Sequence, residues 1–176
     1  MSKIKLATVW LDGCSGCHMS LLDIDEAIAL VAQKADLVYG PLVDAQEFPE
    51  GVDVTLIEGA VANQDDLKLA QTIRKRSRIV VSLGDCAVTG NVPAMRNSIP
   101  VKQLLERVYL EGVTTSPMIP TDGVPALLKR AVPVHEVVFV DLHVPGCPPS
   151  AAAILHVVSE LLEGRKPDVA SKTKFG

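Results

Sequence analysis

Short apolar runs alternate along the chain with stretches in which apolar residues recur at helical spacing. The short runs predict five strands, at residues 4–10, 37–39, 52–57, 78–83 and 136–142. The helical spacing predicts helices at about 19–35, 63–76, 101–110 and 150–163. Strands that alternate with helices form βαβ units with right-handed crossovers. We therefore predict an α/β fold with a flavodoxin-like, doubly wound parallel sheet.

Polar and turn-forming residues indicate how the chain is divided. Residues 1–164 are expected to form a single domain, in which Asn63 caps a helix and Gly164 ends the last one. Residues 111–133 are rich in threonine, proline and glycine, and we expect them to form a surface excursion. Residues 165–176 are polar and basic, and we expect this tail to be ordered only against a neighbouring subunit.

The composition favours a compact domain with a large contact surface. The sequence has 176 residues, of which 48% are hydrophobic and only 3% aromatic, and the mean hydropathy is +0.27. Valine, isoleucine, leucine and alanine supply the apolar excess, as in buried parallel strands or a face covered by another subunit. The formal net charge of −4 argues against non-specific binding of nucleic acid.

Neither a membrane span nor a leader segment is expected from the sequence. No apolar run reaches the roughly 18 residues that cross a bilayer. The first predicted strand begins at Ile4, and no charged region, apolar core, cleavage site or twin arginine precedes it. We expect a cytoplasmic protein, in which cysteines serve more often as metal ligands or redox groups than as disulfides.

All four cysteines follow predicted strands. Cys14 and Cys17 follow the first strand, Cys86 follows the fourth and Cys147 follows the fifth. The carboxyl ends of parallel strands meet at one edge of a sheet, so we expect the four thiols to gather there. Glycine stands close to each cysteine in the sequence, which lets backbone N–H groups approach the sulfurs.

The spacing of the cysteines indicates what they bind. Four thiolates can hold an iron–sulfur cluster or a zinc ion, or they can act as a dithiol redox site. Structural zinc usually takes paired short motifs, whereas here one C-x-x-C motif is joined by two distant cysteines. Ligands spread over a rigid sheet suit a cluster better. The spacing therefore favours iron–sulfur, and leaves a zinc-stabilised interaction module and a dithiol site as alternatives.

Four blocks of residues carry a resemblance to a known family. They are Trp10-Leu11 with Cys14-Ser-Gly-Cys17-His-Met-Ser-Leu-Leu-Asp23, then Ile57-Glu58-Gly59-Ala60, Gly84-Asp85-Cys86-Ala87 and Pro145-Gly146-Cys147-Pro148-Pro149. In this order they resemble the small subunit of nickel–iron hydrogenases, and the resemblance extends over residues 4–163. It implies that Cys14, Cys17, Cys86 and Cys147 hold a 4Fe–4S cluster. In that family the cluster is proximal to a nickel–iron centre in a separate large subunit.

The chain length and the number of cysteines indicate which group within this family the chain resembles most. Small subunits of periplasmic and membrane-bound hydrogenases are longer and hold further clusters, for which this chain has no spare cysteine. The chain is most similar to the short small subunit of cytoplasmic NAD-reducing hydrogenases. This implies two kinds of partner, a nickel–iron large subunit and diaphorase subunits with FMN, iron–sulfur clusters and an NAD site. A quinone- or ferredoxin-linked hydrogenase or a complex I-like enzyme is the alternative, although related complex I subunits carry two adjacent cysteines in the first block.

Two further hypotheses concern the edge of the sheet where the cysteines are expected: a role of Glu58 in proton transfer, and the binding of a flavin. Glu58 ends the third predicted strand, so its carboxylate is a candidate proton relay, with a turn carboxylate that caps the next helix along the chain as the alternative. His18 follows Cys17 directly, and either donates to a sulfur or simply begins a helix. FMN in this chain is the less favoured alternative, because cysteine loops take the strand ends where a flavodoxin-like sheet would bind it, so that a flavin would have to lie beside the cluster.

Overall fold

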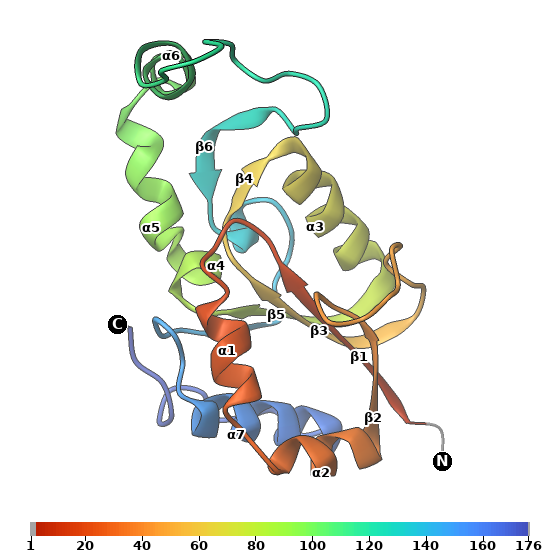
Figure 1. The fold of residues 1–176 in the computed structure, drawn as a ribbon. Coiled ribbons are helices and arrows are strands. Elements are labelled where there is room, and N and C mark those ends of the chain that lie inside the picture. Colours follow the sequence, from red (N-terminus) through yellow and green to blue (C-terminus); the bar gives the residue numbers. More distant parts are fainter. Residues whose placement is uncertain (1–2, 176) are drawn as a thin grey trace.

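A five-stranded parallel sheet forms the centre of the molecule (Figure 1). The structure is a computed structural model that describes residues 3–175, so residues 1, 2 and 176 of the predicted domain and tail lie outside it. The strands are β1 (Ile4–Trp10), β2 (Ala35–Tyr39), β3 (Val52–Glu58), β5 (Ser77–Leu83) and β7 (Leu142–Val144). Their order, β2-β1-β3-β5-β7, is that of a flavodoxin-like doubly wound sheet, as predicted.

Helices cover both faces of this sheet. One face carries α1 (Gly16–Leu22), α2 (Ala27–Lys34) and α7 (Ala151–Leu162), and the other carries α3 (Gln64–Arg76) and α4 (Asp85–Thr89) (Figure 1). Successive side chains of a strand point to opposite faces. Leu6 therefore packs in the same core as Ile154 of α7, while Ala7 packs in the core that contains Ile73 of α3.

The predicted start of α3 is confirmed. The side chain of Asn63 accepts hydrogen bonds from the backbone N–H groups of Asp65 and Asp66, both at 2.9 Å. The carboxylate of Asp66 accepts in return from the backbone N–H of Asn63 at 3.3 Å. This capping box satisfies N–H groups that have no partner inside the helix, and such a cap contributes about 1 kcal/mol.

The helix predicted over residues 19–35 is wrong as one continuous element. The structure has two helices here, because α1 ends at Leu22 and α2 begins at Ala27. Between them Asp25 adopts a left-handed conformation with a φ of 51°. Ile24 is buried within this turn, so the apolar spacing continues across the break and hides it in the sequence.

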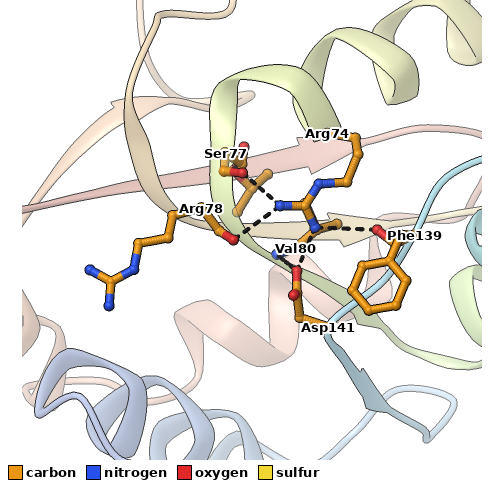
Figure 2. Close-up of polar contacts among 7 residues, drawn as sticks. Arg74, Ser77, Arg78, Val80, Phe139 and Asp141 are labelled. Atoms are coloured by element: carbon orange, nitrogen blue, oxygen red, sulfur yellow. Dashed lines mark hydrogen bonds and ion pairs between the residues drawn. The ribbon is translucent and has the colours of Figure 1, made fainter.

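The strand predicted over residues 136–142 is also wrong for most of its length. A short 3-10 turn, Val134–Glu136, comes first, and pairing with β5 is confined to β7. The valines between them pack against the core without forming a ladder. Figure 2 shows what holds this segment: Arg74 of α3 donates to the carbonyl oxygen of Phe139 and to the carboxylate of Asp141. Asp141 accepts in turn from the backbone N–H of Val80 at 2.8 Å.

Part of the predicted surface excursion at 111–133 is a strand. β6 (Leu127–Val132) pairs antiparallel with β4 (Val61–Asn63), because Leu128 and Val132 pack against the core on the α3 side. Four short helical elements precede it, namely α5 (Asn91–Ala94), a 3-10 turn (Met95–Ser98), α6 (Val101–Glu106) and a π-helical turn (Arg107–Glu111). The helix predicted at 101–110 is thus confirmed, and α5 and α6 extend beyond the main sheet (Figure 1).

The last residues differ from the expectation for a tail. Pro167 is buried and Val169 packs against the core that contains α7, so this segment contacts its own domain. Within residues 3–175, no helix combines the length and the apolar character that crossing a membrane requires.

Candidate functional site

The four cysteines lie after the carboxyl ends of the strands. Cys14 and Cys17 follow β1, Cys86 lies in α4 directly after β5, and Cys147 lies in the loop after β7. All four are free thiols. Cys17 is buried and Cys86 is half-buried, whereas Cys14 and Cys147 are exposed. The group of thiols therefore reaches from the core to the surface of the chain.

The thiols are close enough to influence one another electrostatically. Burial raises the pKa of the Cys17 thiol, and the charges of Glu58 and the other three cysteines raise it further. Burial also raises the pKa of Cys86 to about 11, with Cys147 and Cys14 adding to it. Four thiolates packed in this way need compensating positive charge, which a metal centre supplies when it binds them.

Two glycines leave room for the sulfurs. Gly84 has a φ of 82°, and a Cβ at this residue would lie 2.2 Å from Sγ of Cys17. A Cβ at Gly16 would lie 3.2 Å from Sγ of Cys14. Any other residue at position 84 would displace Cys17. Four free thiols with this space around them fit an iron–sulfur cluster, which takes thiolate ligands.

The arrangement of the thiols differs from that of a single-ion site. In the part of the chain from 3 to 175, no three His, Cys, Asp or Glu side chains are arranged to hold one metal ion. A zinc ion holds each sulfur at about 2.3 Å, so the cysteine loops would have to close in to bind it. A four-iron cluster separates its thiolate ligands more widely than one ion does.

Asp85 joins the loops that carry Cys86 and Cys147. Its carboxylate accepts a hydrogen bond from the backbone N–H of Gly146 at 2.6 Å, and its own backbone N–H donates to the carbonyl oxygen of Gly146 at 2.9 Å. These bonds fix the ends of β5 and β7 against each other. The sequence around Asp85 did not predict this role, because a carboxylate next to a glycine is equally typical of an ordinary turn.

Glu58 lies at the end of β3 and holds the start of α1. Its side chain is buried, and it accepts hydrogen bonds from the backbone N–H groups of Cys17 at 3.3 Å and His18 at 2.9 Å. It also contacts Nδ1 of His18. Ser15, at the N-cap of α1, makes no side-chain capping bond, so Glu58 supplies acceptors that a local cap would normally supply. The sequence predicted neither this cap nor the contact with His18, because both join residues 40 or 41 positions apart.

His18 has one ring nitrogen in contact with Glu58 and one without a partner. Nε2 is buried, and it has no hydrogen-bond partner among the residues that the structure describes. The pair formed by His18 and Glu58 is therefore a buried acid–base contact next to Cys17. Such a contact is able to hold a proton between Nδ1 and the carboxylate.

Comparisons with known proteins agree with the predicted resemblance. The family described as NADH ubiquinone oxidoreductase, 20 Kd subunit, matches residues 14–161. The NAD-reducing hydrogenase HoxS subunit delta of Cupriavidus necator is 37% identical over 174 residues, which cover 96% of this chain and 83% of that protein. A subunit of the F420-non-reducing hydrogenase of Methanothermobacter marburgensis is 39% identical over 175 residues, or 96% of this chain and 56% of that protein.

A solved structure supports the same family resemblance at the level of the fold. One chain of the crystal structure of NAD+-reducing NiFe-hydrogenase in the H2-reduced state superposes with a TM-score of 0.95 and 37% identity. The match covers 99% of this chain and 100% of that one. By contrast, the chain spans only 55 to 59% of the length of three F420-non-reducing relatives. The chain belongs to the NADH ubiquinone oxidoreductase, 20 Kd subunit, family, and the relatives that it matches there are hydrogenase subunits.

Proposed function

We propose that this chain is the electron-transfer small subunit of a cytoplasmic, NAD-linked nickel–iron hydrogenase. In this proposal Cys14, Cys17, Cys86 and Cys147 hold one 4Fe–4S cluster, proximal to a nickel–iron centre in a large subunit. The observation that carries the proposal is the gathering of four free thiols from three loops at one end of the sheet. The relatives named for NAD reduction support the choice of NAD as the electron carrier.

The residues of this chain would hold and shield the cluster. When bound, a 4Fe–4S cluster supplies one-electron transfer. Cys17 anchors the site from the core, and the bonds between Asp85 and Gly146 keep the two remaining cysteine loops together. Glu58 fixes the backbone from which Cys17 projects. These hydrogen bonds restrict the movement of the cysteine ligands and orient the groups around their sulfurs.

The surroundings of the cysteines support a partner at this end of the sheet. Trp10, Met19 and Met95 lie at the end of β1, in α1 and after α5, and each exposes half or more of its surface. Exposed large apolar side chains of this kind are typical of protein interfaces. We propose that a nickel–iron large subunit covers them, and that diaphorase subunits carrying FMN, iron–sulfur clusters and the NAD site complete the complex.

Glu58 is the candidate proton carrier of this chain. Its carboxylate contacts the backbone N–H and Nδ1 of His18, which is the residue after Cys17. We propose that the pair passes protons at the partner-facing edge while Glu58 also holds α1. The two roles are separable in part, because an amide in place of the carboxylate keeps one oxygen that accepts from the backbone of α1 and cannot carry the proton.

The metal content of the purified protein tests the proposal. The full chain is produced with its large subunit and purified without oxygen, and iron, acid-labile sulfide, zinc and flavin are measured. We expect about four acid-labile sulfide per small subunit, about four iron beyond the iron of the nickel–iron centre, and a broad visible absorption that bleaches on reduction. Colourless protein that contains zinc would instead establish the zinc-stabilised interaction module. Flavin released from the two-subunit complex would establish the FMN alternative.

The electron carrier is tested on the complex from its native source. Subunits that co-purify with the chain are identified, and hydrogen oxidation is measured with NAD, a quinone analogue and a ferredoxin as acceptors. We expect diaphorase subunits and hydrogen-dependent reduction of NAD. Activity confined to a quinone or a ferredoxin would replace the NAD-linked assignment and leave the cluster assignment intact.

A further inference from the structure

The turn at residues 90–92, where α4 ends and α5 begins, donates a hydrogen bond to a cysteine of another segment. The side-chain amide of Asn91 donates from Nδ2 to Sγ of Cys147 at a distance of 3.6 Å. Cys86 lies in α4, just before this turn, and Cys147 lies in the loop after β7, so the bond joins two of the segments that carry cysteines.

The backbone of this turn is unusual. Gly90 and Asn91 have φ values of 87° and 30°, so two consecutive residues lie outside the region that side-chain-bearing residues prefer. Glycine adopts such angles without penalty, whereas another residue costs roughly 1 to 2 kcal/mol there. Asparagine tolerates the conformation better than most residues, but a second glycine would cost less. The contact with Cys147 is what an asparagine adds at this position.

Hydrogen bonds to ligand sulfurs change the energy of the cluster that the sulfurs hold. Reduction adds one negative charge to the cluster and its thiolates, and an N–H dipole aimed at a sulfur stabilises that added charge. Such donors therefore raise the reduction potential, which also depends on burial and net charge. The amide of Asn91 is a neutral donor, so it acts without changing the charge of the site.

We propose that Asn91 is a positioning residue that raises the reduction potential of the cluster through Cys147. The inference rests on the proposed function, because it requires a cluster on the four cysteines. The left-handed φ angles of Gly90 and Asn91 place the amide of Asn91 where it reaches Sγ of Cys147. The turn thus sets how readily the cluster accepts an electron.

The test is a redox titration of the two-subunit complex, which under the proposed function holds a single cluster in this chain. Asn91→Gly removes the amide and keeps the backbone conformation accessible. At a fixed potential near the wild-type midpoint, we expect the ratio of reduced to oxidised cluster to fall about threefold to tenfold, the scale of one lost hydrogen bond. At 59 mV per tenfold for one electron, this is a negative shift of roughly 30 to 60 mV. Asn91→Asp should shift the potential further, since it adds a negative charge.

Ser116→Gly is the matched control, because it relieves another uncharged left-handed residue, with a φ of 51°, in the loop before β6. It should leave the potential unchanged. Iron and sulfide are measured for every variant. An unchanged potential in Asn91→Gly with full iron would overturn the inference, and loss of iron in that variant would do so too, because Asn91 would then hold the site rather than tune it. A wild-type complex without a cluster would overturn the proposed function itself.

Discussion

The two ends of the central sheet use their charged side chains differently. At the amino end, Arg74 pairs with Asp141 and donates to backbone carbonyl oxygens of the neighbouring strand and loop (Figure 2). Both side chains of this pair are partly exposed. At the carboxyl end, Glu58 and Asp85 are buried and accept hydrogen bonds from backbone N–H groups of the cysteine loops.

This difference indicates that the charged residues at the amino end serve stability and those at the carboxyl end serve function. The pair at the amino end joins α3 to the start of β7, so it closes the fold without contacting a cysteine. The carboxylates at the other end orient the segments that carry the thiols. Variants at the amino end should therefore change stability alone, whereas variants at the carboxyl end should change the cluster or its reactions.

The largest effect is expected for Cys147→Ser. A serine hydroxyl is a poor substitute for a thiolate, so the cluster should be lost or converted to a smaller one, and most of the iron should disappear. The remaining chain should unfold more easily, because binding of a metal centre is coupled to folding. Iron and sulfide analysis of the anaerobic complex measures this loss. A variant with full iron and activity would mean that Cys147 is not a ligand.

Glu58→Gln should have the next largest effect. General acid–base catalysis typically accelerates a step by a factor of about 10² to 10⁴. If Glu58 carries protons, the rate of hydrogen-dependent NAD reduction should therefore decrease by a factor in this range. Reduction of a dye by NADH, which uses only the diaphorase subunits, is the internal control and should not change. Iron content should stay close to the wild-type level, because glutamine keeps the size of the side chain and one oxygen that accepts from the backbone of α1.

Two other outcomes for this variant decide its role differently. Wild-type hydrogen-dependent activity would make Glu58 a structural carboxylate that caps α1. A parallel loss of iron and activity would show that its charge, rather than a proton, supports the site.

Gly84→Ala tests the carboxyl end of the central sheet by adding a single methyl group there. That carbon would lie 2.2 Å from Sγ of Cys17, so the thiol must move. We expect a loss of about 1 to 3 kcal/mol from overpacking, together with a lower iron content. Gly123→Ala is the control, since Gly123 has a similar φ of 73° with nothing within 4 Å of the added carbon. Equal iron contents in the two variants would rule out a special role for the space beside Cys17.

The smallest effect is expected at the amino end. Arg74→Ala removes one donor from the carboxylate of Asp141, which keeps its bond from Val80, and one donor from each of several carbonyl oxygens. This should cost about 1 to 3 kcal/mol of stability. For a chain of this size each 1 kcal/mol lowers the unfolding temperature by roughly 2 to 4 °C. Arg107→Ala, which breaks an exposed pair with Glu111, should cost only about 0.3 to 0.5 kcal/mol.

Iron per chain distinguishes the two ends in this experiment. Both arginine variants should keep their full iron content, because neither side chain contacts a cysteine loop. A large loss of iron in Arg74→Ala would contradict the separation between the two ends of the sheet.

Local signals in the sequence predicted much of the fold. The strands β1, β3 and β5 are apolar runs of strand length, and most of their hydrophobic residues are buried. The cap at Asn63 depends on residues two and three positions away, so it was visible in the sequence. The position of the cysteines after strands follows from the same pattern, since a parallel sheet brings the ends of its strands together.

Only the tertiary structure decided the features that depend on distant contacts. Apolar spacing could not show the break near Asp25, because the turn buries Ile24 as a helix would. It could not show that the valines before β7 pack without pairing, because burial requires apolar side chains in either case. The roles of Glu58, Asp85 and Asn91 likewise come from hydrogen bonds to residues 40 or more positions away. The sequence alone thus determined which segments are buried and where the thiols gather, whereas the hydrogen bonds that orient them depend on how distant segments pack.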